Sequence, residues 1–290
     1  MTTSTSQVPL YDLHSHSTAS DGTLSPTALV HHASAQGVDV LALTDHDTTD
    51  GIDEARTAAA EAGVALVPGV EISVTWRGVT VHIVGLNVDI DNARLQAGLA
   101  GLREFRAWRG EEMARRLAKA GIPGALEGAQ AFSQGEILSR THFARFLVAA
   151  GHASDMRKVF GKFLTHNRPG YVSGEWAALE SAVSWIRAAG GQAVIAHPAR
   201  YRLSATRLRA LIEAFIASGG EALEVVSGSH SAGDVHGMAQ YARRFGLLAS
   251  QGSDYHGPEQ SWLELGRLPA LPSGCTPVWA RWSGVRRASA

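Results

Sequence analysis

The chain has 290 residues, of which 45% are hydrophobic and 18% charged, and its formal net charge at pH 7 is −1. This size and composition suit one large α/β domain or a domain with an insertion, and the near-zero charge argues against broad binding to duplex DNA. Cys275 is the single cysteine, which excludes an intrachain disulfide and a thiolate metal cluster. The amino terminus lacks a signal-peptide pattern, and no apolar run approaches the ~18 residues of a membrane span. We therefore expect a cytoplasmic protein that does not enter membranes.

The first part of the chain alternates short apolar runs with helical patterns. Ser25-Pro26 predicts a capped helix start, Gly37 predicts its end, and a second helix is expected over residues 51–62. Apolar strands that alternate with helices indicate parallel β-α units, whose ligands lie at the carboxyl ends of the strands. The expected strands cover residues 12–16, 38–43, 64–67, 72–76 and 79–87, the last two as a hairpin.

From about residue 95 the chain changes to long helical patterns with no strand between them. Helices are expected over residues 95–120, 134–150 and 155–165. This change divides the chain into a barrel domain, residues 1–94 and 171–290, and a helical insertion, residues 95–170, that forms a lid over the substrate.

The α/β alternation then resumes and completes the fold. Helices are expected over residues 175–189, 203–217 and 232–245, and strands over residues 192–196, 222–226 and 247–250. Together these elements give about seven strands, which predict an α/β fold of the barrel type with every candidate ligand on one rim. The polar amino-terminal tail and the Arg/Ala/Ser carboxyl-terminal tail are expected to be disordered.

Histidines and acidic residues recur within or just after the expected strands. In a strand, the side chains of His14 and His16 point to the same side, although an isolated pair of this kind is more often two surface histidines. Because such residues recur at several other strand ends, we interpret them as metal ligands instead. The candidate metal-ligating and catalytic residues are His14, His16, Asp21, His46, Glu71, His82, His197, Asp254 and His256.

Nine nitrogen and oxygen ligands are more than one or two ions require, so we expect three divalent ions. Mn²⁺ is the preferred metal, with Zn²⁺ or Fe²⁺ as alternatives, because no sulfur ligand is present and histidine-rich sites suit Mg²⁺ less well. Clustered cations lower the pKa of a bridging water, so that hydroxide can attack, and neutralise the charge on a phosphoryl oxygen. Amide hydrolysis uses only the first effect, whereas phosphate ester hydrolysis uses both.

The arginine-rich insertion favours phosphate esters. Arg140, His142 and Arg145 crowd less than two helical turns, as a phosphate-binding edge would. For most of the other arginines, a solvated helix surface with salt bridges to glutamates is the better interpretation.

In order and spacing, His14-x-His16, Thr44-Asp45-His46, Glu71, His82, His197-Pro198 and Asp254-x-His256 resemble the motifs of the polymerase and histidinol phosphatase (PHP) superfamily. The resemblance implies a distorted seven-stranded (β/α) barrel with a trinuclear metal centre. It also implies three ligand sets: His14, His16, Glu71 and Asp254 for the first ion, Glu71, His82 and His197 for the second, and Asp21, His46 and His256 for the third.

Within that superfamily, the segments around Arg140 and Arg200 resemble bacterial 3′,5′-nucleoside bisphosphate phosphatases, some relatives of which trim short RNA from the 5′ end. This narrower resemblance implies a small nucleotide substrate, or short RNA, that is bound through its phosphates. The implied phosphate-binding residues are Arg106, Arg109, Arg116, Arg140, His142, Arg145 and Arg200.

Two alternatives stay open from the sequence. One is a phosphatase for another small monoester, such as histidinol phosphate, which would keep all nine ligands and differ in its pocket. The other is a non-catalytic accessory module, against which the intact ligand set argues. The leaving-group acid and the oligomeric state are not assigned from the sequence.

Overall fold

The computed structural model describes residues 8–282, so most of both expected tails lies outside the described residues. Seven strands form one sheet in the order of the chain. β4 runs antiparallel to β3 and β5, and all other neighbours are parallel. The strands are β1 (Tyr11–Asp12), β2 (Val40–Leu43), β3 (Ala65–Trp76), β4 (Val79–Leu86), β5 (Gln192–Ile195), β6 (Ala222–Ser227) and β7 (Leu248–Gly252).

The first and last strands approach each other and nearly close the sheet into a barrel. The Leu13 N–H donates to the Gln251 carbonyl at 3.0 Å, and an isolated parallel bridge joins Ser15 to Tyr255. The predicted α/β fold, a distorted seven-stranded barrel, is therefore confirmed. The antiparallel β4 is the source of its distortion.

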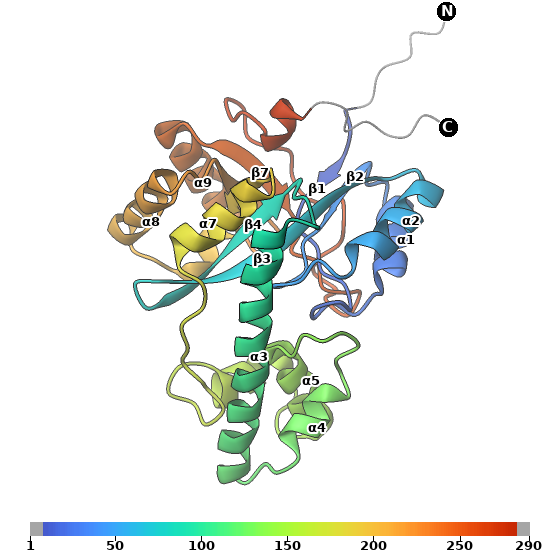
Figure 1. The fold of residues 1–290 in the computed structure, drawn as a ribbon, viewed down its shortest axis with the longest axis vertical. Helices are drawn as coiled ribbons and strands as arrows, with labels where there is room; N and C mark the ends of the chain where they lie inside the picture. The colour runs from blue at the N-terminus through green and yellow to red at the C-terminus, as the bar shows by residue number, and fades with distance from the viewer. Residues whose placement is uncertain (1–7, 283–290) are drawn as a thin grey trace, which may run out of the picture.

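Helices cover the outside of the barrel (Figure 1). α1 (Pro26–Ala35) and α2 (Ile52–Ala62) lie on one side, and α7, α8 and α9 lie on the other. The Ser25 side chain accepts the Ala28 N–H at the start of α1, as the sequence predicts. The bounds of the second group are α7 (Leu179–Ala188), α8 (Ala205–Ala217) and α9 (Ala232–Phe245).

Alternate residues of the strands fill the barrel interior. Leu13, Val40, Val67 and Val84 belong to one buried cluster with residues of β5, β6 and β7. A 3-10 turn, Val278–Arg281, closes the end of the barrel opposite the candidate ligands, with the ring of Trp279 stacked 4.2 Å from that of Tyr11.

The prediction of two strands at residues 64–67 and 72–76 was wrong, because β3 is continuous. Pro68 pairs with Leu43 of β2, and from Gly69 onward the strand pairs with β4. A Cβ atom at Gly69 would lie 2.9 Å from the Gly85 carbonyl oxygen, so glycine permits the close approach of β4 at this point. Glu71 therefore lies inside a strand, level with His46, which follows β2.

Helices also make up the part of the chain between β4 and β5. α3 (Ala93–Lys119) is long: Leu95 and Leu99 pack with the barrel core, whereas Met113 and Leu117 pack in a separate core formed among the helices. The other helices of this helical unit are α4 (Ala125–Gln130), α5 (Arg140–Ala149), α6 (Met156–Val159) and the π-helical turn η1 (Phe160–Leu164).

Three details of this region differ from the prediction. α5 begins at Arg140 rather than residue 134, because Ser139 is its cap and forms a capping box with His142. The short α4 was not predicted. α7 begins at Leu179 rather than residue 175, because the preceding residues run alongside β3, where the Thr75 N–H donates to the Ala177 carbonyl.

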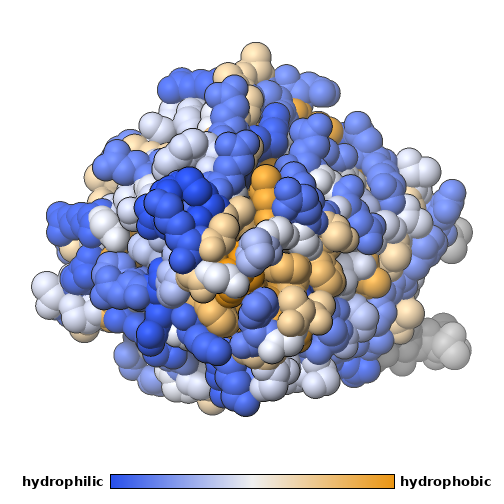
Figure 2. All heavy atoms as spheres, turned by 90° about the horizontal axis from the view of Figure 1, so that it is seen from below, coloured by the Kyte–Doolittle hydropathy of each residue, from blue (hydrophilic) through white to orange (hydrophobic). Residues whose placement is uncertain are grey.

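Figure 1 shows α3 extending away from the barrel, with α4 and α5 beside its lower half. Figure 2 views the molecule from that end, where apolar side chains gather near the middle of the face and hydrophilic residues surround them. Across residues 8–282, none of the helices has the length and apolar character needed to traverse a bilayer.

Candidate metal centre and phosphate pocket

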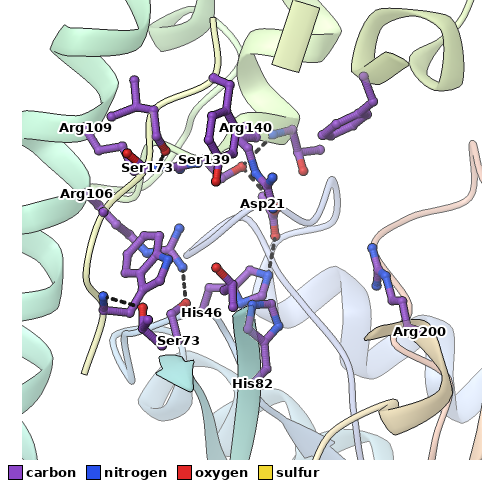
Figure 3. A pocket seen from close by; sticks show the side chains of 18 of the residues that line it. Asp21, His46, Ser73, His82, Arg106, Arg109, Ser139, Arg140, Ser173 and Arg200 are labelled. Atoms are coloured by element: carbon purple, nitrogen blue, oxygen red, sulfur yellow. Dashed lines mark hydrogen bonds and ion pairs between the residues drawn. The ribbon is translucent and has the colours of Figure 1, made fainter. Parts of the chain in front are cut away.

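All nine candidate ligands converge at the carboxyl ends of the strands. Three overlapping groups have ligand atoms within 4.8 Å of one another: His16, Asp21, His46 and His256; His14, Glu71, His197 and Asp254; and His46, Glu71 and His82. Six of the nine line a pocket of about 480 Å³ between the barrel and the helical unit. Figure 3 shows His46, His82 and Asp21 at the base of this pocket.

Glu71 lies at the centre of the cluster. Its Oε2 atom is 2.9 Å from His46 Nδ1 and 3.3 Å from both His14 Nε2 and His16 Nε2. Its Oε1 atom is 2.8 Å from His82 Nδ1 and 2.9 Å from His197 Nε2. One carboxylate thus faces five imidazoles, a geometry suited to bridging cations.

The groups overlap the three implied ligand sets without matching them fully. His16 lies in the group of Asp21, but its Nε2 atom is also 3.2 Å from Asp254 Oδ1. His197 joins the group of His14. The division of the nine residues among ions therefore stays a prediction.

Buried polar atoms without hydrogen-bond partners fit a metal centre. Within residues 8–282, the atoms of the cluster that make no hydrogen bond are His14 Nε2, His16 Nε2, His46 Nδ1, His197 Nδ1, Asp21 Oδ1 and Glu71 Oε2. A buried polar atom left without a partner costs about 1–3 kcal/mol, so six in one place call for a ligand that satisfies them. Nitrogen and carboxylate oxygen donors suit divalent transition metals.

The electrostatics of the cluster keep its carboxylates charged. Burial opposes the charge of Glu71, but the imidazoles of His82, His46 and His14 outweigh burial and hold its pKa well below its usual range. The same balance, with His14 and His16 as the main partners, holds the pKa of Asp254 low. Burial lowers the pKa of His46 to about 4. Burial also opposes the charge of His14 and His16, but the neighbouring carboxylates outweigh it, so that the pKa of His14 lies well above its usual value and that of His16 rises to about 10. Metal binding at these two histidines would therefore release protons.

Glu224 supports two ligands from different strands, a role that its apolar surroundings in β6 did not reveal. Its Oε1 atom is 3.0 Å from His14 Nδ1, and its Oε2 atom accepts the His197 backbone N–H at 2.5 Å. His197 has a positive φ of 27°, which side chains rarely adopt, so this bond holds a strained position. Glu224 is 2% exposed. The sequence signal was a lone acidic residue at an interior position of a buried strand.

We expect Glu224→Gln to weaken metal binding about 10- to 100-fold, because it replaces a carboxylate that orients a liganding imidazole with a neutral amide. Calorimetric titration of the metal-stripped variant with Mn²⁺ measures this affinity. Glu221→Gln is the control, because Glu221 directly precedes the same strand and pairs with Arg281 at the opposite end of the barrel. Equal affinities in the two variants would contradict the positioning role.

The carboxylates of the two aspartates that flank His46 bond to neighbouring segments of the chain. Asp45 accepts hydrogen bonds from the Ser17 N–H at 2.8 Å and from the Ser20 hydroxyl. Asp47 accepts the Ser73 N–H at 2.7 Å and pairs with Arg106 at 2.6 Å. Both aspartates therefore fix segments that carry candidate ligands.

Four of the predicted phosphate-binding arginines line the pocket: Arg106, Arg109, Arg140 and Arg200. In Figure 3, Arg106, Arg109 and Arg140 lie on the side of the helical unit, and Arg200 lies on the opposite side of the histidines. The guanidiniums of Arg106 and Arg109 lie 4.9 and 5.4 Å from the Trp176 ring centroid. Stacking on this indole orients both cations.

The other three predicted phosphate-binding residues lie away from the pocket lining. Arg116 pairs with Glu112 and donates to the Tyr171 carbonyl. Arg145 donates to the Asp21 carbonyl at 2.9 Å and lies 3.3 Å from Glu259. His142 accepts the Ser139 N–H in the capping box of α5. A substrate role for these three stays a prediction.

Comparison with known proteins agrees with this site. The PHP domain family matches residues 12–217. The chain is 50% identical over 269 residues to a 3′,5′-nucleoside bisphosphate phosphatase of Chromobacterium violaceum, covering 92% of this chain and 94% of the relative. It is 49% identical over 280 residues to the 5′-3′ exoribonuclease Rnm of Escherichia coli, covering 96% and 95%.

A solved structure of an amidohydrolase from Chromobacterium violaceum, with bound sulfate and no metal, superposes with a TM-score of 0.90. The two chains are 50% identical, and the match covers 93% of this chain and 94% of the other. The fold, the site and both kinds of similarity agree, and the chain belongs to the PHP domain family.

Proposed function

We propose that the protein is a metal-dependent phosphatase that removes the 3′-phosphate from nucleoside 3′,5′-bisphosphates such as adenosine 3′,5′-bisphosphate. The clustered ligands, the arginines beside them and the name of the relative from Chromobacterium violaceum support this function. We further propose that it trims short RNA from the 5′ end, because relatives at 46–49% identity are named 5′-3′ exoribonucleases.

The observation that carries the proposal is a pair of cations without an anionic partner. Within residues 8–282, neither Arg109 nor Arg140 forms an ion pair with a carboxylate, and both line the pocket. Burial lowers the pKa of Arg109 to about 9, and the neighbouring Arg140 and Arg106 add to the effect. Such cations cost free energy unless an anion joins them, and a second phosphate of the substrate would supply that charge.

Different residues of the chain interact with the two phosphates of the substrate. Divalent cations held by the nine ligands would lower the pKa of a coordinated water and neutralise charge on the reacting phosphoryl group. Arg109 and Arg140 bind the 5′-phosphate on the side of the helical unit, which positions the 3′-phosphate over Glu71 and the histidines. Binding energy from the phosphate that does not react is thereby used to orient the one that does.

We expect the gently purified protein to carry about three transition-metal ions per chain, with Mn²⁺ giving the highest activity after reconstitution. The reason is the number of buried donor atoms, which exceeds what one ion coordinates. Elemental analysis of the reconstituted protein measures the ratio of metal to chain. A reproducible ratio of one would contradict a trinuclear centre.

Phosphate release from a panel of substrates tests the proposed function. Metal-stripped protein is reconstituted with Mn²⁺ and assayed with adenosine 3′,5′-bisphosphate, histidinol phosphate and p-nitrophenyl phosphate. We expect the bisphosphate to have the highest kcat/KM by at least about tenfold, because it alone places a second phosphate on the arginines. A preference for histidinol phosphate would support the other monoester phosphatase, and no hydrolysis of any substrate would support a non-catalytic module.

A further inference from the structure

We infer that RNA leaves the pocket over an exit wall formed by the loops that follow β5, β6 and β7, with Arg200, Arg202 and Trp262 as its contact residues. This inference rests on the proposed function and locates the part of an RNA substrate that a bisphosphate lacks. The three loops stand side by side on the rim: the Ala199 N–H lies 3.4 Å from His230 Nε2, and a Cβ atom at Gly228 would lie 2.4 Å from Leu263 Cδ1.

The chemistry of the two reactions defines where the chain must leave. In both, a water oxygen bonds to phosphorus, the P–O3′ bond of the 5′-terminal nucleoside breaks, and O3′ takes up a proton. With the bisphosphate, the products are a nucleoside 5′-monophosphate and inorganic phosphate. With RNA, one phosphoryl oxygen is esterified to the next nucleoside, and the shortened RNA keeps that phosphate at its new 5′ end. Only RNA therefore needs an opening beyond the reacting phosphorus.

The side of the helical unit is closed to such a chain. Arg106 and Arg109 are only 6% and 7% exposed. The segment that joins the helical unit to α7 packs over them: Trp176 stacks on both guanidiniums, and a Cβ atom at Gly174 would lie 2.0 Å from the Phe105 ring. A terminal phosphate fits this side, but a continuing chain does not.

The opposite side is open and carries positive charge. The Arg200 side chain is 58% exposed, lines the pocket and pairs with Asp254 Oδ2 at 2.8 Å. Figure 3 shows Arg200 across the histidines from Arg106 and Arg109. Arg202 follows in an exposed position with φ 50°, and among the described residues no carboxylate pairs with it. Two guanidiniums at the open edge suit the phosphates downstream of the scissile bond.

Trp262 supplies an aromatic surface on the same wall. Its side chain is 79% exposed, whereas Trp108, the next most exposed tryptophan, is 51% exposed and packs on Phe105. Trp262 lies in a compact loop that starts directly after His256, folded by hydrogen bonds from Gln260 N–H to Gly257 and from Leu263 N–H to Gln260. The loop after β6 contacts both this loop, through Gly228, and the loop that carries Arg200 and Arg202, through His230. An exposed indole on a surface that also carries arginines is suited to stacking single-stranded bases.

The test compares RNA with the bisphosphate in the metal-loaded protein. Binding of a fluorescent 5′-phosphorylated hexaribonucleotide with hydrolysis-resistant phosphorothioate linkages is measured by anisotropy. We expect Trp262→Ala to raise its Kd about 5-fold or more, and Arg202→Gln to raise it and to reduce its dependence on salt. Both variants should keep the wild-type kcat/KM for adenosine 3′,5′-bisphosphate, which shows that the site is intact.

Trp108→Ala is the matched control, because it removes an exposed indole on the closed side. Unchanged hexanucleotide binding in both exit-wall variants, or an equal loss in Trp108→Ala, would overturn the inference. A loss of bisphosphate hydrolysis as well would overturn it too, since the two residues would then act on the metal centre. The binding assay needs no hydrolysis, so a failure of the proposed function shows separately, as absent phosphate release by the wild type.

Discussion

Glu71→Ala is expected to remove nearly all activity and most of the bound metal. Glu71 is fully buried and faces five imidazoles within 3.3 Å, so its loss leaves several metal-binding groups incomplete at once. Metal ions contribute several kcal/mol of transition-state stabilisation. At about 1.4 kcal/mol per factor of ten, kcat should fall on the order of 10³-fold or more.

Asp45→Ala provides the comparison for this loss, because it removes a buried carboxylate that lies next to His46 in sequence and hydrogen-bonds to Ser17 and Ser20. We expect Asp45→Ala to lower activity about 10- to 100-fold, as substitutions of residues that orient metal ligands typically do. Kinetics and elemental analysis on both variants compare their losses of activity and of bound metal. A loss in Asp45→Ala as large as in Glu71→Ala would mean that the ligand set is wrong.

Arg109→Gln is expected to lower kcat/KM for adenosine 3′,5′-bisphosphate. The loss corresponds to roughly 2 to 4 kcal/mol of transition-state stabilisation, because the substitution removes the buried cation proposed to pair with the 5′-phosphate. Hydrolysis of p-nitrophenyl phosphate, which has no second phosphate, should change little. The two rates measured on one variant separate recognition of the substrate from chemistry at the metals.

Arg115→Gln is the matched control for Arg109, because Arg115 is on the same helix, is 53% exposed and pairs with Glu112. Its removal should leave both rates within about twofold of the wild type. Equal losses on both substrates in Arg109→Gln would indicate a structural role for Arg109, and no loss would place the 5′-phosphate elsewhere.

The sequence predicts that the candidate ligands cluster, because their signal is local. The expected strand at residues 12–16 is shorter in the structure, where β1 ends at Asp12, but His14 and His16 still point to the same carboxylate, Glu71. His197 and Asp254 each follow a buried strand, so strand ends suffice to place them on the same rim. Glu71 was found for the wrong reason. The sequence places Glu71 after a strand that ends at residue 67, whereas pairing with β2 and β4 keeps the chain extended through Pro68 and Gly69.

The supporting residues were harder to predict because their signal is not local. Glu224 acts on His14, which is 210 positions away, and its own segment reads only as a buried strand. Gly252 is similar: a Cβ atom there would lie 2.2 Å from His14 Cβ, a constraint invisible before the barrel closes. The arginines were ambiguous for the same reason, since burial and partners, not composition, distinguish Arg109 from Arg115.

The central claim is that one phosphate is bound by arginines while the other reacts at the metal centre. The most direct test is kcat/KM of the Mn²⁺-loaded wild type on adenosine 3′,5′-bisphosphate and on adenosine 3′-monophosphate, which differ only in the 5′-phosphate. A charged contact worth roughly 2 kcal/mol or more predicts a preference of about 30-fold or more for the bisphosphate. Equal values for the two substrates would contradict the claim.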